Sequence, residues 1–202
     1  MVNTGLTFSA ASERNKAPIL DVLRKVLPAE GKVLEIGSGT GQHIVFFAPV
    51  FAQLTWQPSD QSGNLNGLKY RIRKEGSSNI LHALELDVLG CWPDSKFDAV
   101  FSSNTAHIMS WQAVCAMFAG VADVLPPGGV FCLYGPFNEG GMFTSSSNEQ
   151  FDSDLRARDP MMGLRDSAAL ELLAGRHQIN LMKKFQLPAN NQMLVFRKIG
   201  AW

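Results

Sequence analysis

Short apolar runs alternate with segments of helical periodicity between residue 15 and about residue 135. The apolar runs predict strands at 32–36, 54–57, 80–86, 97–102 and 130–134. The segments around them, whose apolar residues recur every three or four positions, predict helices at 15–27, 44–51, 63–74 and 111–125. Strands that alternate with helices form βαβ units, so the pattern favours an α/β protein built on a parallel sheet.

The pattern changes after the fifth strand. Residues 135–147 are rich in Gly, Ser, Asn and Phe, and such long polar connections often carry function. A helix predicted at 168–174 then precedes two strand-like runs, 179–187 and 192–198, which we expect to form an antiparallel hairpin at the sheet edge. We interpret residues 1–202 as a single domain and residues 135–165 as a substrate-side loop and insertion.

Composition excludes several classes of function. Eighteen basic residues balance eighteen acidic ones, and the longest basic run, 71–74, is typical of a solvated helix face rather than of nucleic-acid binding. No apolar run approaches the roughly 20 residues of a membrane span, and no signal peptide is evident. Three cysteines without metal-type spacing predict neither disulfides nor a metal site. We expect an intracellular protein, cytoplasmic with the nucleus left open, and leave its oligomeric state open.

Three glycines spaced two apart, Gly37, Gly39 and Gly41, follow the first predicted strand. Glycine belongs where a strand turns directly into a helix and a ligand touches the backbone. The dinucleotide fingerprint would put its third glycine at position 42, where this chain has Gln42. The spacing therefore predicts a cofactor loop but disfavours a nicotinamide oxidoreductase.

An acidic residue, Glu35, stands two positions before the first glycine. A carboxylate there would repel a pyrophosphate and attract a cation. S-adenosylmethionine carries an ammonium and a sulfonium but no phosphate, so the motif favours it as the cofactor, with S-adenosylhomocysteine as the product. Local backbone amides could instead be the partners of Glu35.

Two aspartates follow later strands and add candidate cofactor contacts. Asp60 is placed to accept hydrogen bonds from both ribose hydroxyls, or to cap the next helix. Asp87 is placed to accept from the adenine amino group, or to close a turn. Because the carboxyl ends of parallel strands meet at one edge of a sheet, we expect these groups to converge. The predicted cofactor set also includes residues of the glycine loop and of two other segments: Arg14, Asn15, Ser38, Thr40 and Asn104.

Residues 1–15 form a possible lid over the cofactor. Arg14 could grip a carboxylate with two hydrogen bonds, with Asn15 beside it. The alternative is an ordinary helix start, in which Asn15 caps backbone amides and Arg14 is solvated.

The segment 102–107 follows the fourth strand and should face the transferred methyl group. It lacks the motifs of enzymes that methylate nucleobases, and it has no aspartate for a magnesium site. What remains is an in-line displacement at the sulfonium methyl group, which needs positioning and can use a base. His107 is the candidate base and Asn104 a candidate substrate or cofactor contact; packing of His107 against Trp111 and turn closure by Asn104 are the alternatives. Structural positions are expected for the other histidines, in the core for His82 and at the surface for His43 and His177.

Tyr134, Asn138 and Glu139, in or just before the long loop, are predicted to face the substrate. Alternatively, Phe137 and Phe143 simply anchor this loop to the core.

Several longer motifs resemble the methyltransferase-like 26 family, whose domain of unknown function has the class I methyltransferase fold. They are residues 12–16 with 18–20, 33–43, 56–60, 103–108 and 134–137. The resemblance implies a Rossmann-like, seven-stranded, mostly parallel sheet in the order 3-2-1-4-5-7-6, with strand seven antiparallel and helices on both faces. It also makes a functional role for Arg14 and Asn15 an expectation, and it names no acceptor.

The sequence thus favours a methyltransferase that uses S-adenosylmethionine and acts on a small-molecule acceptor. A catalytically inactive protein that binds S-adenosylmethionine and serves as a scaffold is the alternative, because segment 102–107 holds no recognisable catalytic constellation.

Overall fold

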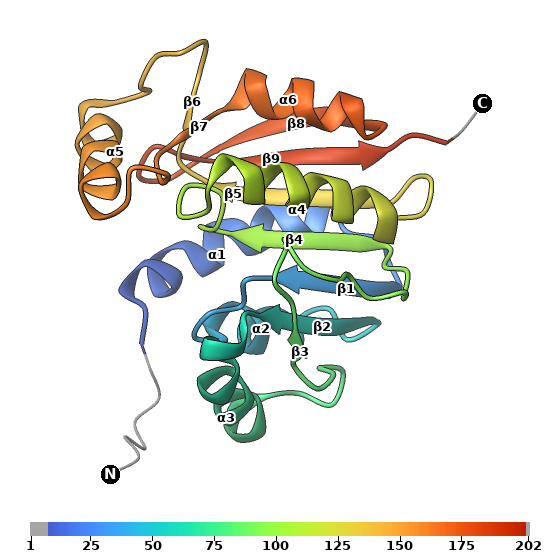
Figure 1. Ribbon diagram of the computed structural model, residues 1–202. Helices are drawn as coiled ribbons and strands as arrows, with labels where there is room; N and C mark the ends of the chain where they lie inside the picture. Colours follow the sequence, from blue (N-terminus) through green and yellow to red (C-terminus); the bar gives the residue numbers. More distant parts are fainter. Residues whose placement is uncertain (1–7, 201–202) are drawn as a thin grey trace.

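In the computed structural model, which describes residues 8–200, a seven-stranded sheet runs in the order β3-β2-β1-β4-β5-β9-β8 (Figure 1). Its strands are β1 (Gly31–Ile36), β2 (Leu54–Asp60), β3 (Leu84–Glu85), β4 (Ala99–Ser103), β5 (Val130–Gly135), β8 (Ile179–Leu187) and β9 (Asn191–Lys198). The first five are parallel, and β9 is antiparallel to both of its neighbours. The expected strand order and the C-terminal hairpin are confirmed.

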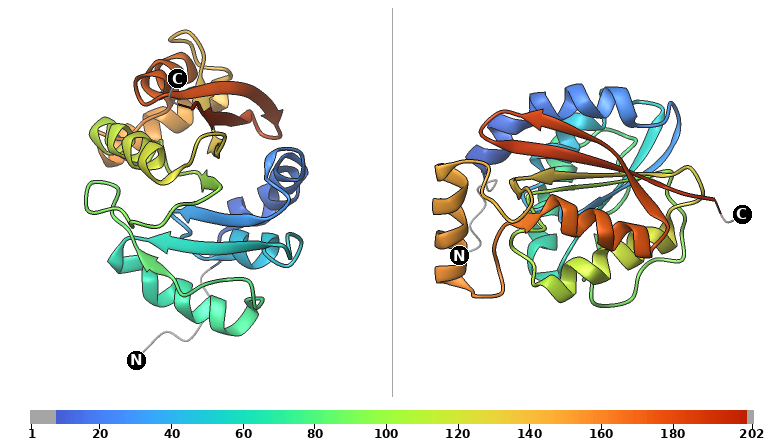
Figure 2. Two further views of the ribbon diagram at one scale, coloured as in Figure 1. Left: turned by 90° about the vertical axis from the view of Figure 1, so that its right-hand side faces the viewer. Right: turned by 90° about the horizontal axis from the view of Figure 1, so that it is seen from above.

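Helices cover both faces of the sheet, as expected. The helices are α1 (Ala10–Val26), α2 (Gln42–Phe47), α3 (Leu65–Glu75), α4 (Trp111–Val124), α5 (Ser146–Arg158) and α6 (Ser167–Arg176). In Figure 2, α1 lies on one side of the sheet and α4 and α6 lie on the other. Val33 packs into the α1 and α2 side while its neighbour Leu34 packs into the α4 and α6 side, so β1 is buried on both faces like other central parallel strands.

Helix α1 begins at Ala10, five residues before the predicted start, because Ser9 caps it by accepting a hydrogen bond from the Ser12 N–H. Pro18 consequently lies inside the helix rather than in its first turn. Of the proposed lid, residues 1–7 lie outside the described residues, and residues 10–15 are helical.

The third strand is much shorter than the predicted 80–86. At the start of the predicted range, a single isolated β-bridge pairs Ile80 with Trp56 of β2 and does not extend into a strand. The side-chain amide of Gln57 donates to the His82 carbonyl, which diverts that group from the strand ladder. His82 is exposed, so its expected place in the core is wrong.

The segment 135–165 is ordered into short elements. Its strand β6 (Phe137–Asn138) pairs with β7 (Arg165–Asp166), and α5 between them begins at the Ser145 cap. The sequence analysis missed α5, whose polar residues give little helical periodicity. Helix α5 lies near the end of the sheet at which β1 and β4 terminate (Figure 1). None of the helices within residues 8–200 is long and apolar enough to span a membrane.

Candidate functional site

A cavity of about 640 Å³ lies at the carboxyl ends of the central strands. The start of α1, the glycine loop after β1, the segments that follow β2, β3 and β4, and one side chain of α5 form its wall. Eight predicted site residues line it together: Gly37, Ser38, Gly39, Thr40, Asp60, Asp87, Asn104 and His107. The convergence of the strand ends is therefore as expected for an open α/β sheet.

The glycine loop depends on glycine at two cavity positions. Gly37 and Gly39 have φ values of +71° and +53°, which favour glycine. A Cβ atom on Gly37 would stand 2.6 Å from the Thr105 Cγ2 atom, whereas one on Gly39 would meet nothing within 4 Å. The backbone at Gly39 therefore faces open space that a ligand can occupy.

Gly41 lies outside the cavity wall and serves as the left-handed cap of α2. A Cβ there would approach Leu68 and Arg71 of α3 at 3.0 and 3.2 Å. The Arg71 Nε atom donates a 2.6 Å hydrogen bond to the Thr40 carbonyl, so α3 supports the loop from outside.

Asp60 ties the loop to the next strand. Its Oδ2 atom accepts from the Gly39 N–H at 2.6 Å, and its Oδ1 atom accepts from the Gln61 N–H and the Asn64 side chain at 2.8 and 2.7 Å. Asp87 is exposed and accepts from the Leu89 N–H at 3.0 Å. Asp87 thus makes the turn contact of its alternative interpretation, whereas Asp60 is not the N-cap of the next helix, and both aspartates line the cavity.

Glu35 lies behind the loop, outside the residues that form the cavity wall. Its Oε2 atom accepts a 2.7 Å hydrogen bond from the Ser38 hydroxyl. Burial raises the pKa of Glu35 to about 7, a change that the Ser38 bond opposes and the Asp60 charge adds to. The carboxyl group therefore changes charge near neutral pH.

Asn104 and His107 lie on the loop after β4. Asn104 has a left-handed φ of +59°, and its N–H donates to the Tyr134 carbonyl at 2.9 Å. The buried His107 ring meets the Phe151 ring edge-on, with 5.2 Å between centroids, so its aromatic neighbour comes from α5 and is not the Trp111 of the alternative interpretation. Burial, helped by the Arg165 charge, lowers the pKa of His107 to about 4, so the ring is neutral at pH 7.

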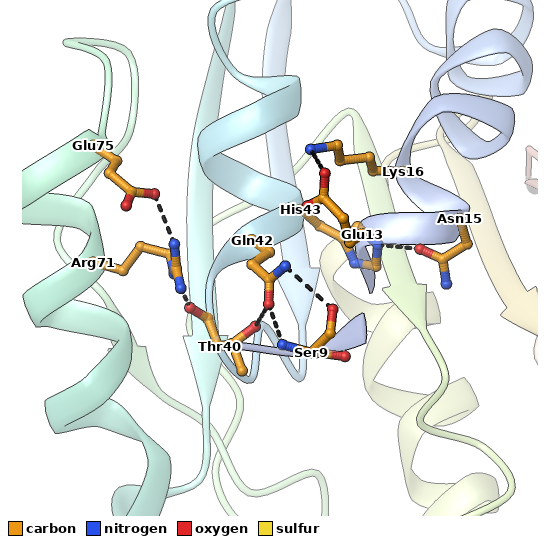
Figure 3. A network of polar contacts seen from close by, with 9 residues as sticks. All are labelled: Ser9, Glu13, Asn15, Lys16, Thr40, Gln42, His43, Arg71 and Glu75. Carbon is orange, nitrogen blue, oxygen red and sulfur yellow. Dashed lines mark hydrogen bonds and ion pairs between the residues drawn. The ribbon is translucent and has the colours of Figure 1, made fainter. Parts of the chain in front are cut away.

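His43 is buried and lines the cavity, so its expected place at the surface is wrong. Its Nε2 atom lies 2.7 Å from the Asn15 Oδ1 atom (Figure 3), and its ring stacks on Phe47 at 5.4 Å. Burial lowers the pKa of His43 to about 4. The spacing of His43 and Phe47, one helical turn apart, was the sequence signal for a shared buried face.

Gln42, the residue in place of the fingerprint glycine, joins the start of α1 to the glycine loop (Figure 3). Its Oε1 atom accepts from the Ser9 N–H at 2.5 Å and from the Thr40 hydroxyl at 3.1 Å. Its Nε2 atom donates back to the Ser9 carbonyl at 3.2 Å. The start of α1 is thereby held against the cavity.

Other predicted site residues do not form the cavity wall. Arg14 is exposed on α1, and Asn15 contacts His43 and Tyr134. Tyr134 is buried with α1 and α2 on the far side of the sheet, and burial raises its pKa. Asn138 and Glu139 lie on and after β6, where the Glu139 carboxylate accepts from Gln192 at 2.8 Å.

Phe151 and Arg165 are functional candidates that the sequence analysis missed. Both come from the segment around α5, whose contact with the His107 loop is tertiary and leaves no periodic signal. Within residues 8–200, no group of three or more His, Cys, Asp or Glu side chains is arranged to hold a metal ion.

Solved structures share this fold. An O-methyltransferase family protein from Burkholderia thailandensis superposes with a TM-score of 0.81 at 14% identity, over 95% of this chain and 58% of that one. The mitomycin 7-O-methyltransferase MmcR gives 0.80 at 10% identity, over 94% and 54%. CalO1, a methyltransferase in calicheamicin biosynthesis with bound S-adenosylhomocysteine, gives 0.75 at 16% identity, over 93% and 55%.

At such identities the likeness establishes the class I methyltransferase fold, and the chain spans just over half the length of these proteins. A family model matches residues 6–198, nearly the whole chain. The chain therefore belongs to the family described as "Protein of unknown function (DUF938)".

Proposed function

We propose that this protein is a methyltransferase that uses S-adenosylmethionine and acts on a small, uncharged acceptor. One observation carries the proposal: the open backbone at Gly39, the Asp60 carboxylate bonded to it and the neutral His107 ring share one cavity. A volume of about 640 Å³ is in the range of small-molecule sites.

The wall of the cavity suits this cofactor better than a phosphate compound. Among the described residues, its charged side chains are Asp60 and Asp87, and neither a lysine nor an arginine lines it. Two carboxylates would repel a pyrophosphate, whereas they can accept hydrogen bonds from ribose hydroxyls and an adenine amino group. In this proposal Asp60 holds the ribose, Asp87 the adenine, and the loop from Gly37 to Thr40 the methionine end.

Glu35 acts indirectly in this proposal. Its carboxyl group lies one hydrogen bond behind Ser38, so its charge reaches the cofactor's ammonium through the loop. His43 forms the wall beside the start of α1 and is held there by Asn15, and Asn104 turns the loop between the cofactor and His107.

The acceptor side of the cavity is formed by uncharged groups, including Phe151, Met109 and His107. When bound, S-adenosylmethionine would supply an electrophilic methyl group, and the electron pair of the broken sulfur–methyl bond would stay on the cofactor's sulfur. The acceptor atom uses its own lone pair to form the new bond and releases a proton. An alkylated hydroxyl is far more acidic than an imidazolium with a pKa of about 4, so neutral His107 can accept that proton late in the step.

Two finer assignments belong to the same proposal. We infer membership of the methyltransferase-like 26 family from the motifs it shares, above all residues 12–16 and 33–43. We also infer an intracellular site of action from the three free thiols, Cys91, Cys115 and Cys132.

Calorimetric titration with S-adenosylhomocysteine tests the cofactor, and transfer of a labelled methyl group to matched neutral, anionic and cationic small molecules tests the acceptor. We expect saturable binding and transfer to neutral acceptors. Absence of binding to the folded protein contradicts the proposal, and binding without any transfer favours the scaffold alternative.

A further inference from the structure

The segment from α5 to β7 holds the loop that carries His107. The Gly163 N–H donates a 2.9 Å hydrogen bond to the His107 carbonyl, and Phe151 of α5 covers the His107 ring. The segment itself is stabilised by Asp152, which accepts from the Leu164 N–H and from Arg156, each at 2.7 Å. The segment from α5 to β7, which is distant in sequence from the His107 loop, therefore fixes the acceptor side of the cavity wall.

Arg165 is the centre of this contact. Its side chain is buried, and its Nε atom donates to the Ala106 carbonyl at 3.0 Å. Its Nη2 atom donates to the Met109 carbonyl and, at 2.9 Å, to the Met161 carbonyl. The guanidinium thus bonds the loop on both sides of His107 and joins it to the residues that follow α5.

A guanidinium suits this position because its planar, rigid fork can bind several carbonyl groups at fixed angles. Burying such a charge is costly unless hydrogen bonds compensate for lost water. Within the described residues, its hydrogen bonds go to carbonyl groups, and no carboxylate lies within ion-pair distance. Burial, and then the Arg156 charge, lower the pKa of Arg165, and the Asp152 charge opposes this change, so the guanidinium charge is compensated only in part.

Few charged groups face His107 from the elements that pack on it. Helix α5 contributes the uncharged Phe151, and its Asp152 is bonded to Arg156. From the sheet, the uncharged Gly135 of β5 faces the ring, since a Cβ there would stand 3.6 Å from the His107 Nδ1 atom. Arg165 is the charged group that acts on the ring, and it disfavours a second positive charge there.

We propose that Arg165 is a positioning residue of the acceptor site: it holds the His107 loop through the Ala106 and Met109 carbonyl groups, joins that loop to the residues after α5 through the Met161 carbonyl group, and places a positive charge near the His107 ring. The proposal rests on the proposed function only for its consequence, which is that His107 stays free to accept the acceptor's proton. Its structural content can be measured without cofactor or acceptor.

The test is an NMR titration of the histidine rings in the full chain, with His107→Gln used to assign the His107 signal. In the wild type, we expect His107 to titrate near pH 4. In Arg165→Gln, its pKa should rise by about one unit, because a like charge is removed and the loosened loop admits water. In Arg165→Lys, which keeps the charge but cannot reproduce the fork, the rise should be smaller.

Arg158→Gln is the matched control, because Arg158 is an exposed residue at the end of α5. It should leave His107 unchanged, and the His43 signal provides an internal reference in every variant. An unchanged His107 titration in folded Arg165→Gln overturns the proposal. If that variant does not fold, an unchanged titration in Arg165→Lys overturns it instead.

Methyl transfer gives a second readout. With a neutral acceptor, Arg165→Gln should lower kcat about tenfold or more while S-adenosylhomocysteine binds as in the wild type, because the misplaced group lies on the acceptor side. The acid limb of the pH profile should move to higher pH together with the His107 pKa. If the wild type did not bind S-adenosylhomocysteine, the proposed function would be contradicted. The His107 titration would still test the positioning role of Arg165 on its own.

Discussion

The Asp60 Oδ2 atom lies 2.6 Å from the Gly39 nitrogen, so the carboxylate at the end of β2 holds the tip of the loop that follows β1. The other oxygen, Oδ1, fixes Gln61 and Asn64 at the start of the next helical turn. One side chain therefore shapes two walls of the cavity. Its proposed role toward ribose must be separated from this structural role.

Substituting Asp60 separates the two roles. Asp60→Ala should lose about 1–3 kcal/mol of unfolding free energy, because the Gly39 N–H loses its charged acceptor. Asp60→Asn keeps an acceptor oxygen for Gly39 and should fold with most of that stability. Both should bind S-adenosylhomocysteine at least tenfold more weakly, since a neutral amide cannot accept strongly from two hydroxyls.

Urea unfolding and calorimetric titration measure the two effects. The exposed Asp94→Asn is the control and should change neither. Wild-type affinity in Asp60→Ala would rule out the ribose contact.

Most strands and helices were predictable because apolar runs and helical periodicity record how each element is buried, and the strand order followed from the family resemblance. The length of β3 was not, because Gln57 redirects the His82 carbonyl through a side-chain contact that no periodicity reports. Helix α5 escaped for a related reason: it buries few side chains, among them Asn148 and Asp152, which are polar and so resemble exposed residues in a sequence.

The part of the site that is formed by the ends of the strands was predictable. Gly39, Asp60 and His107 follow strand ends and therefore meet at one edge of the sheet. Tyr134 also stands near a strand end, but successive side chains of β5 point to opposite faces, and Tyr134 points toward α1. The burial of His43 depends on α1, whose start the sequence put too late.

Two glycines of the loop should respond differently to alanine. Gly37→Ala should cost about 2 kcal/mol or more of unfolding free energy, because its Cβ would stand 2.6 Å from Thr105 at a φ of +71°. Gly39→Ala should cost only about 1 kcal/mol, since its Cβ meets no atom within 4 Å. The methyl group of the alanine at position 39 would nevertheless fill the space in which the methionine end of the cofactor is proposed to lie. S-adenosylhomocysteine should therefore bind at least tenfold more weakly to Gly39→Ala.

Thermal or urea unfolding and calorimetry distinguish these effects, and the two variants serve as controls for each other. Equal losses of stability would contradict the difference in packing. Unchanged ligand affinity in Gly39→Ala would place the ligand elsewhere.

Glu35 should make the protein less stable as pH rises. Its folded pKa of about 7 lies above the ordinary glutamate value of 4.5, so between these values the folded state binds more protons than the unfolded state. The unfolding free energy therefore falls across this window, by about 3 kcal/mol in total. Glu35→Gln removes the titrating carboxyl group. The unfolding free energy of this variant should therefore rise relative to that of the wild type on going from pH 5 to pH 8.

Urea unfolding at the two pH values measures the change. Glu30→Gln, which alters an exposed carboxylate, should shift nothing. A pH-independent difference between Glu35→Gln and the wild type would mean that Glu35 ionises normally.

The two cavity histidines should act in the opposite direction. The folded pKa values of His43 and His107 are about 4, below the ordinary histidine value of 6.5, so between these values the unfolded state binds more protons. Each histidine therefore lowers the unfolding free energy as pH falls from 6.5 to 4, by about 3 kcal/mol in total. With two histidines against one glutamate, the protein should lose stability on acidification below pH 6.5.

Urea unfolding from pH 4 to pH 7 measures this loss of stability. Replacing either His43 or His107 with glutamine should remove that histidine's contribution of about 3 kcal/mol to the pH dependence of the unfolding free energy. The exposed His82→Gln is the control and should leave the pH dependence unchanged. A wild-type slope in both cavity variants would mean that these rings titrate alike in the folded and unfolded states, so burial would not lower their pKa values.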